Sequence, residues 1–300
     1  MKQVVITGVS GSLGSFLAAH LLERGYKVVG ISRTNPGIDG LKHVSHDLQT
    51  PLPANRACFG ADWPVVNCAA VTRDGHSRQL EQANLAITQN ALRLTYGPFV
   101  QISSSSVYDL THPSVKVTEG QATGNYKFLN SYAWSKFQTE QLVLHDELSE
   151  FVILRPHALI GPNDQTLGPR VRRAIRNGRL YLPAGGRAQH EFTSFANFSN
   201  AIRLSLEAMA GGVQLNRAIN ISNGVGTSIS DAIAAGLGAD APEIRSVPVE
   251  LAWNLARIAE AVTPAGREPR ISRYQVAQLA FDRSYDLSLA KDLLGYLPQN

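Results

Sequence analysis

Short apolar runs alternate along the first half of the chain with longer segments in which apolar residues recur at helical spacing. The runs are typical of buried strands, and the longer segments are typical of amphipathic helices. The expected strands are residues 3–7, 26–32, 65–67, 99–103 and 151–154. The expected helices are residues 13–25, 77–95 and 131–148. This alternation predicts a parallel sheet covered by helices on both faces.

The rhythm loosens after about residue 160, where prolines and glycines separate shorter elements. We therefore predict an α/β fold, a doubly wound parallel Rossmann-type sheet with a smaller C-terminal substrate-binding region. The dinucleotide-binding domain is expected over residues 1–160, and the mainly substrate-binding region over residues 161–300.

Part of the second region, about 192–225, is expected to return to the main domain. A helix at 198–209 and a strand at 218–222 have the patterns that this requires. With 300 residues, the chain has room for one large α/β unit or for two closely joined domains.

Composition and charge narrow the classes of function. The chain is 44% hydrophobic and 17% charged, which argues against a disordered or fibrous protein. Its net charge of +4 is too small and too dispersed to indicate nucleic-acid binding. Cys58 and Cys68 lack metal-type spacing and the histidines are scattered, so we expect reduced thiols and no metal site.

No membrane association is expected. Glycines interrupt the apolar run that follows Lys2, which argues against a signal peptide. No stretch of about 18 apolar residues predicts a membrane span. We expect a cytoplasmic protein whose partner is a small molecule.

A glycine-rich turn follows the first strand and opens the first helix. Glycines let the backbone approach a pyrophosphate closely, and the N-terminus of a helix offers free N–H groups to it. This context predicts a dinucleotide site. Its candidate cofactor-binding residues are Gly8, Ser10, Gly11, Ser12, Leu13 and Gly14.

The end of the second strand bears on which dinucleotide binds. An acidic residue there usually holds the ribose 2′-hydroxyl of NAD, but the strand ends in Ser32-Arg33. A guanidinium suits the 2′-phosphate of NADP, and Ser32 can add a hydrogen bond. NADP is therefore favoured, with NAD as the alternative.

Tyr132 and Lys136 are spaced to lie one turn apart on the same face of a helix. A cationic Lys136 and an oxidised nicotinamide are expected to lower the pKa of the phenol, so that it serves as acid or base toward a carbinol or carbonyl oxygen. The serines at 103–106, after an expected strand, supply hydroxyls that can orient that oxygen.

These motifs resemble those of the extended short-chain dehydrogenases/reductases, the NAD-dependent epimerase/dehydratase family. The similarity covers the chain from residue 3 to residue 298. The matching segments are TGVSGSLG (7–14), SSSSVYD (103–109), TE (118–119), SYAWSK (131–136), RP…GP (155–162) and YD…LGYLP (285–298).

The resemblance implies roles for individual residues. Ser104 is the catalytic serine, with Ser105 as the alternative, and Tyr132 is the acid/base. Lys136 also holds the nicotinamide ribose hydroxyls, and Tyr132 too lies against the cofactor. Further cofactor-binding residues are Asp47, Leu48, Cys68, Ala69, Ala70, Asn84 and Pro156.

Departures from the family pattern bear on the substrate. Ala158 replaces an Asn, and His190 an Arg, that commonly contact a nucleotide-sugar phosphate. Ser105 and Ser106 replace the Asp-Glu pair of dehydratases, and Ser106 also replaces the Cys of the epimerases that make fucose-type sugars. The candidate substrate-binding residues are Ser105, Ser106, His157, Arg187 and His190.

Other features allow a structural explanation beside the functional one. A basic run between Arg170 and Arg179 on an expected helix is read as a solvated face, with one Arg as a candidate phosphate contact. Trp134 is expected to pack or to border the substrate. The resemblance implies a homodimer through the helices at 77–95 and 131–148.

Three functions stay open at this point. The first is hydride transfer between NADP(H) and a carbinol or ketone of a sugar-like compound, nucleotide sugars included. The second is a nucleotide-sugar epimerase with tightly bound NAD. The third, a non-catalytic dinucleotide sensor, is disfavoured because such proteins usually lose the Tyr–Lys pair.

Overall fold

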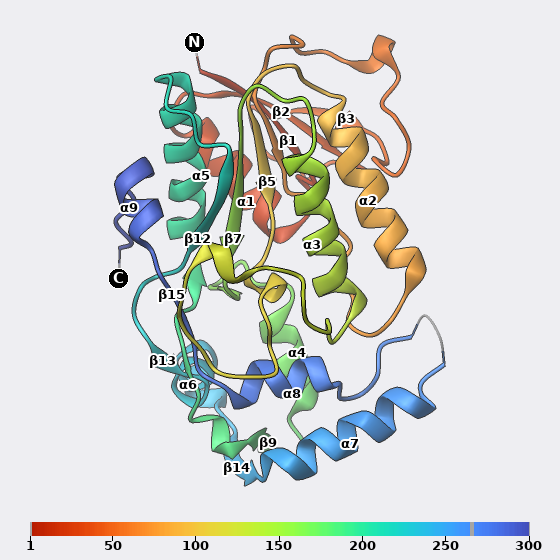
Figure 1. Cartoon of the computed structure of the whole chain (residues 1–300), viewed down its shortest axis with the longest axis vertical. Helices are drawn as coiled ribbons and strands as arrows, with labels where there is room; N and C mark the ends of the chain where they lie inside the picture. The colour runs from red at the N-terminus through yellow and green to blue at the C-terminus, as the bar shows by residue number, and fades with distance from the viewer. Residues whose placement is uncertain (1, 265–266, 300) are drawn as a thin grey trace.

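The computed structural model describes residues 2–264 and 267–299 (Figure 1). Its centre is a seven-stranded sheet in the order β12-β7-β5-β4-β1-β2-β3, in which all neighbours are parallel. The strands are β1 (Gln3–Thr7), β2 (Lys27–Ser32), β3 (Lys42–Ser45), β4 (Val65–Asn67), β5 (Phe99–Ile102), β7 (Phe151–Pro156) and β12 (Arg217–Ile221). The predicted α/β fold with a parallel Rossmann-type sheet is confirmed.

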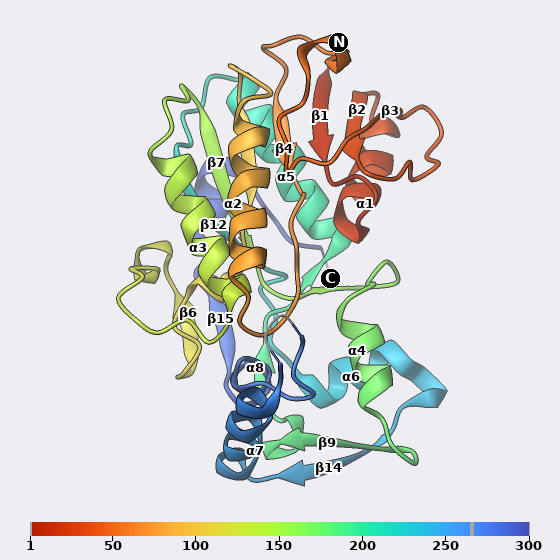
Figure 2. The same cartoon turned by 90° about the vertical axis from the view of Figure 1, so that its right-hand side faces the viewer.

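Helices cover both faces of this sheet, with α5 and α9 on its left in Figure 1 and α2 and α3 on its right. The helices are α1 (Ser12–Leu22), α2 (Arg78–Leu92), α3 (Ser131–Leu144), α5 (Phe195–Ala210) and α9 (Ser288–Leu294). Leu17 of α1 and Phe198 of α5 belong to one buried core, whereas Ile87 of α2 and Val143 of α3 belong to the other. The sheet is therefore doubly wound (Figure 2).

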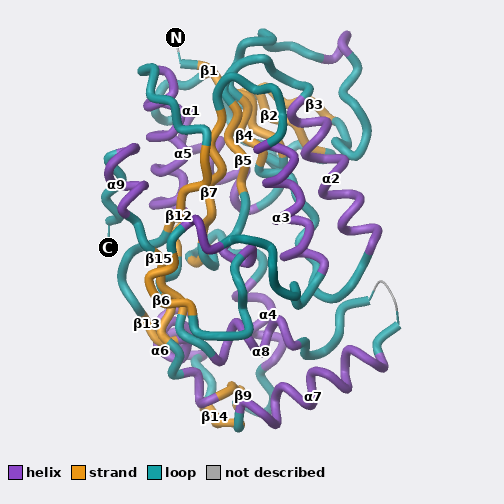
Figure 3. Tube along the Cα trace, in the orientation of Figure 1, coloured by secondary structure: helices purple, strands orange, loops and turns teal. Residues whose placement is uncertain are grey.

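A second set of elements forms the lower half of the molecule in Figures 1 and 3. They build a four-stranded sheet, β13-β10-β15-β6, and two strand pairs, β11-β8 and β14-β9. The strands are β6 (Ser114–Val117), β8 (Leu159–Ile160), β9 (Arg179–Pro183), β10 (Gln189–His190), β11 (Thr193–Ser194), β13 (Thr227–Ser228), β14 (Glu243–Val247) and β15 (Arg283–Tyr285). The helices are α4 (Leu167–Ala174), α6 (Ile229–Leu237), α7 (Val249–Val262) and α8 (Arg273–Ala280).

The basic run is not one helical face, and that expectation was wrong. Arg170, Arg172 and Arg173 lie on α4, which ends at Ala174, whereas Arg179 begins β9. Asn177 and Gly178 have φ values of 50° and 72°, and Arg176 and Arg179 exchange two backbone hydrogen bonds around them. Asn-Gly readily adopts such a turn, and this turn separates the arginines.

No helix within the described residues is both long and apolar enough to cross a lipid bilayer.

Candidate active site

The glycine turn after β1 forms a cradle that side chains would fill. Gly8 has a φ of 68°, and a Cβ there would lie 2.8 Å from the Cα of Ala69. A Cβ on Gly14 would collide with the carbonyl oxygen of Gly8. Helix α1 begins at Ser12 without a side-chain cap and without an acidic residue in its first turn. The free N–H groups and the missing side chains fit a pyrophosphate.

The arginine that follows β2 is exposed and available to bind a ligand. Ser32 is buried, and its hydroxyl donates to the carbonyl of Thr34 at 2.8 Å and contacts Nε2 of His43 at 3.0 Å. Arg33 is exposed and has no ion pair within residues 2–264 and 267–299. Ser32 thus holds the turn that presents the guanidinium.

The segment after β3 is held by local hydrogen bonds. The half-buried carboxylate of Asp47 accepts from the backbone N–H of Gln49 at 3.0 Å. Leu48 is buried, and its carbonyl accepts from Nδ2 of Asn90 at 2.9 Å. Helix α2 therefore anchors this turn.

The carboxyl ends of β1, β4 and β5 are joined by buried amides. Oδ1 of Asn67 accepts from the Thr7 hydroxyl at 2.6 Å, and its Nδ2 donates to Gln101 at 2.9 Å. The Thr7 hydroxyl accepts from the backbone N–H of Ala69 at 3.2 Å, which fixes the half-buried residues 68–70 beside Gly8. These contacts place the end of β4 against the glycine turn.

Asn84 links the β4 loop to the helix that carries Tyr132. Its Oδ1 accepts from the backbone N–H of Val71 at 2.7 Å, and its Nδ2 donates to the hydroxyl of Ser135 at 2.9 Å. An asparagine has one acceptor and one donor group, and both are engaged here.

Ser104, Tyr132 and Lys136 meet at the carboxyl end of β5. Ser104 is half-buried, its hydroxyl donates to Oγ of Ser106 at 3.1 Å, and it also lowers the pKa of the Tyr132 phenol. Nζ of Lys136 donates to the carbonyl of Ile102, the last residue of β5, at 2.7 Å. It lies 6.0 Å from the centroid of the Tyr132 ring. Helix α3 presents both side chains because they are one turn apart.

The protein groups together raise the pKa of Tyr132. Burial raises it most, the nearby Tyr274 raises it further, and Ser104 and the charge of Arg170 lower it. Burial also lowers the pKa of Lys136 to about 8, against the charges of Cys68 and Glu140. Among the protein groups alone, desolvation of the phenol outweighs the charges that favour phenolate. The lowering expected from Lys136 together with an oxidised nicotinamide stays a prediction.

Ser105, His157 and His190 form a buried row that ends on a backbone carbonyl. Nε2 of His190 is 3.1 Å from the carbonyl of Phe281, and its Nδ1 is 2.9 Å from Nε2 of His157. Nδ1 of His157 is 2.8 Å from the Ser105 hydroxyl and 3.0 Å from the Tyr285 hydroxyl. Because a carbonyl only accepts, neutral His190 must donate from Nε2 and His157 must donate to it.

Burial lowers the pKa values of both histidines. The pKa of His190 falls to about 4, and Arg283 adds to the effect of burial. For His157, burial again dominates, and the charges of His190 and Arg283 follow. The pair is therefore neutral near pH 7.

Sequence reasoning missed Tyr274 on α8. Its hydroxyl is 2.8 Å from the hydroxyl of the buried Ser106. The two residues are 168 positions apart, and Tyr274 belongs to none of the recognised motifs. No local signal in the sequence could have found this contact.

The remaining candidate cofactor- and substrate-binding residues lie apart from one another. Pro156 is buried at the end of β7, whereas Arg187 is exposed next to the turn at Gly185-Gly186. Trp134 packs against Phe128 and Phe137, at ring-centroid distances of 5.2 Å and 5.9 Å.

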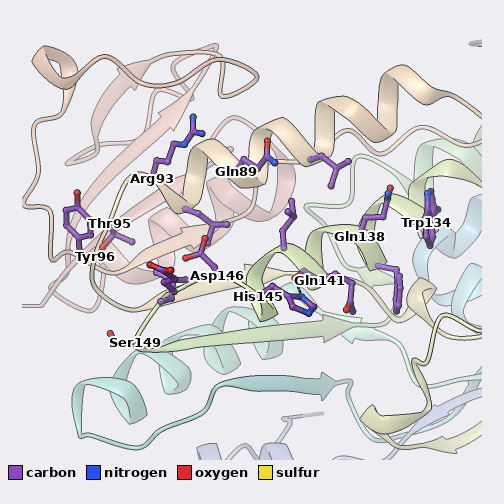
Figure 4. Close-up of a pocket in the computed structure, with 16 residues that line it drawn as sticks. Gln89, Arg93, Thr95, Tyr96, Trp134, Gln138, Gln141, His145, Asp146 and Ser149 are labelled. Carbon is purple, nitrogen blue, oxygen red and sulfur yellow. Dashed lines mark hydrogen bonds between the residues drawn. The ribbon is translucent and has the colours of Figure 1, made fainter.

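Trp134 also lines a groove of about 1010 Å³ between α2 and α3 (Figure 4). Its apolar lining includes Leu85, Leu92, Phe137 and Leu142. The groove lies along the outer sides of the two helices and is lined by neither Ser104 nor Tyr132. It is therefore a different site from the one at the carboxyl end of β5.

The chain matches one family model over most of its length and is similar to named enzymes over nearly all of it. The sequence model of the "NAD dependent epimerase/dehydratase family" matches residues 4–222. The 2-alkyl-3-oxoalkanoate reductase of Stenotrophomonas maltophilia (strain K279a) is 30% identical, over 99% of this chain and 95% of that protein. The decarboxylating sterol-4-alpha-carboxylate 3-dehydrogenase of Mus musculus is 26% identical, over 99% and 87%.

Solved structures share the fold. The UDP-glucuronic acid 4-epimerase of Bacillus cereus, solved in complex with NAD, superposes with a TM-score of 0.72 at 21% identity. The match covers 99% of this chain and 94% of that one.

Proposed function

The chain belongs to the NAD-dependent epimerase/dehydratase family, and we propose that it performs net hydride transfer between an NAD(P) nicotinamide and a carbinol or ketone carbon. One observation carries this proposal. Ser104, Tyr132 and Lys136 meet at the end of β5, and β4 alone separates that strand from β1 and its glycine cradle. Such a reaction needs an acid/base beside the site that holds the cofactor.

The side chains have separate tasks. The bound nicotinamide supplies or accepts the hydride. Burial keeps the phenol of Tyr132 protonated, so it acts as an acid toward a ketone oxygen. Lys136 uses one ammonium proton on Ile102 and keeps two, which we assign to the nicotinamide ribose.

Ser104 orients the reacting oxygen in this proposal. It is half-buried and its hydroxyl lowers the pKa of Tyr132, whereas Ser105 is buried and its hydroxyl is hydrogen-bonded to His157. The less buried serine, whose hydroxyl acts on the acid, is the better hydrogen-bond donor to substrate.

We assign the cofactor to the glycine turn, the turns after β2 and β3, and the β4 end, with NADP preferred over NAD. The exposed guanidinium of Arg33 supports this preference, because it is free to pair with a 2′-phosphate. We divide the chain into a cofactor-binding part, residues 1–160, and a mainly substrate-binding part, residues 161–300, of which about 192–225 return to the main domain.

Two substrate classes are candidates for the ketone. A sugar-like compound suits a site rich in hydroxyl groups. A 3-oxo acid with an apolar chain is favoured by the 30% identity to a 2-alkyl-3-oxoalkanoate reductase.

Cofactor use separates net redox from epimerisation. The purified protein is denatured, the released nucleotide is identified by mass spectrometry, and NADPH absorbance at 340 nm is followed with sugar ketones and 3-oxo acids. We expect NADPH consumption with one ketone class and little retained NAD. Retained NAD, together with isomerisation of a nucleotide sugar without added cofactor, would establish the epimerase instead.

We propose a homodimer through the groove between α2 and α3. The groove is large, and Leu85, Phe137 and Leu142, which line it, are only half-buried in a single chain. A second copy of the same helix pair would cover them.

A further inference from the structure

The loop after β4 holds the residues that come just before Tyr132. Nδ2 of Asn130, the N-cap of α3, donates to Oδ1 of Asp74 at 2.8 Å. The backbone N–H of Ser131 donates to the carbonyl of Gly75 at 3.0 Å. Tyr132 follows directly, so this loop sets the position of the first turn of α3 and of the phenol that it carries.

The same loop is held from the lower half of the molecule. Oδ2 of Asp74 accepts from the hydroxyl of Ser272, the N-cap of α8, at 2.6 Å. The backbone N–H of Asp74 donates to Oε1 of Glu268 at 2.9 Å, and that oxygen pairs with Arg170 of α4 at 3.3 Å. Asp74 is 6% exposed, so water competes little for these hydrogen bonds.

Helix α8 brings a hydroxyl group to the candidate active site. Tyr274 stands two positions after Ser272. Its hydroxyl is 2.8 Å from the hydroxyl of Ser106, which in turn is 3.1 Å from that of Ser104. The position of α8 therefore decides which hydroxyls line the end of β5, where Tyr132 acts on the substrate in the proposed reaction.

We propose that Asp74 is a positioning residue that fixes Tyr132 of α3 against α8, so that a bound ketone meets the phenol in its reactive geometry. This rests on the proposed hydride transfer, because it assigns how the site for that reaction is assembled. A carboxylate suits the task, since it only accepts hydrogen bonds and has two oxygens, one for each helix cap. Its charge makes both hydrogen bonds short and strong.

The first variants remove or keep these hydrogen bonds, and the substrate is whichever sugar ketone or 3-oxo acid the wild type reduces. Asp74→Ala removes both, so kcat/KM for the ketone should fall roughly 10- to 100-fold, because small displacements of reacting groups are costly. Asp74→Asn keeps an oxygen for Asn130 and offers its NH2 group to the Ser272 oxygen, so kcat/KM should stay within about threefold.

A single turnover distinguishes a misplaced acid from partial unfolding. NADPH is bound to the full-length enzyme, saturating ketone is added, and the loss of NADPH absorbance is followed. A partly unfolded population lowers the amplitude and leaves the rate constant unchanged. A misplaced acid lowers the rate constant at full amplitude, and this is the result that we expect for Asp74→Ala.

Asn130→Ser tests the same link while serine still caps α3. It loses the donor to Asp74, so the rate constant should fall about as far as in Asp74→Ala. The double variant should lose little more, because one break already separates the two helices. Asp231→Ala is the matched control: its carboxylate accepts from the hydroxyl of Ser228, the N-cap of α6, at 2.6 Å, and its removal should leave the rate constant unchanged.

Two kinds of outcome count against the proposal. A wild-type rate constant in Asp74→Ala or in Asn130→Ser, or a loss confined to the amplitude, would show that Asp74 does not position the acid and would leave the proposed hydride transfer standing. A wild type that reduces none of these ketones would overturn the proposed hydride transfer, and the role of Asp74 with it.

Discussion

The phenol of Tyr132 is held neutral by burial, so its chemistry depends on the position of its proton. We predict that Tyr132→Phe lowers kcat/KM at least about 10³-fold and that Lys136→Ala also abolishes turnover. NADP binding and far-UV circular dichroism should change little in Tyr132→Phe. Tyr96→Phe, at a side chain 87% exposed, is the matched control. Rates like the wild type in Tyr132→Phe would exclude the mechanism.

Arg33 tests the cofactor assignment. Because its guanidinium is exposed and unpaired in the described chain, Arg33→Ala should weaken NADP binding by about 10-fold or more and NAD binding by less than about threefold. Fluorescence titration of the reduced cofactors measures both affinities. Arg24→Ala, at the exposed end of α1, should change neither. Equal losses for the two cofactors would remove the argument for NADP.

The buried histidine pair makes stability depend on pH. In the unfolded chain each imidazole has a pKa near 6.5, but burial holds the folded pKa of His190 at about 4 and that of His157 well below its usual value. Below pH 6.5 the unfolded state therefore binds more protons. The free energy of unfolding should fall by up to about 1.4 kcal/mol per pH unit for each histidine between about pH 6 and pH 4.

Urea unfolding between pH 7.5 and pH 5 measures this slope. The double variant His157→Gln, His190→Gln should flatten it, whereas His145→Gln, at an exposed position at the end of α3, should not. The same slope in all three proteins would show that other groups cause the pH dependence.

At the scale of elements, a buried ion pair fastens α3 to the main sheet. Glu140 of α3 and Arg155 of β7 pair at 2.7 Å with side chains 0% and 5% exposed, and Arg155 also donates to Tyr108. Glu140→Gln leaves a buried cation without its counter-charge, so we expect a loss of about 3–5 kcal/mol in the free energy of unfolding.

An exposed ion pair gives the matched comparison. Glu243→Gln removes the partner of Arg179, at 3.2 Å, and of Arg245, at 2.7 Å, all with side chains about half exposed, and should cost about 1 kcal/mol at most. Urea denaturation of both variants distinguishes the two cases. Similar losses would mean that the Arg155 pair does not hold α3 in place.

The predictability of the elements depended on where each one packs. The main-sheet strands are short apolar runs because both faces of the sheet are covered, so their pattern is visible in the sequence. In the lower half, a strand such as β10 has two residues and pairs with β13 and β15, far along the chain. A strand of two residues has no periodicity that a sequence pattern can show. The helix expected to continue through the basic run is α4, and it ends at Ala174.

At the scale of the whole molecule, the groove between α2 and α3 predicts the assembly. Leu85→Arg would place a charge among the apolar side chains of this groove, so the variant should become monomeric while the wild type is a dimer. Light scattering after size-exclusion chromatography measures the mass, and thermal unfolding shows whether the variant still folds. Leu255→Arg, on the exposed face of α7, should stay dimeric. A monomeric wild type would contradict the proposal.

By itself, the sequence determined the parallel α/β fold, the glycine cradle and the Tyr132–Lys136 pair. Each of these depends on residues that are close along the chain: a strand and the turn after it, or two positions one helical turn apart. The tertiary structure decided the rest of the site. Asp74 brings Tyr274 to the serines, and burial raises the pKa of Tyr132 against the charges nearby. Desolvation and contacts between residues 168 positions apart exist only once the chain has folded.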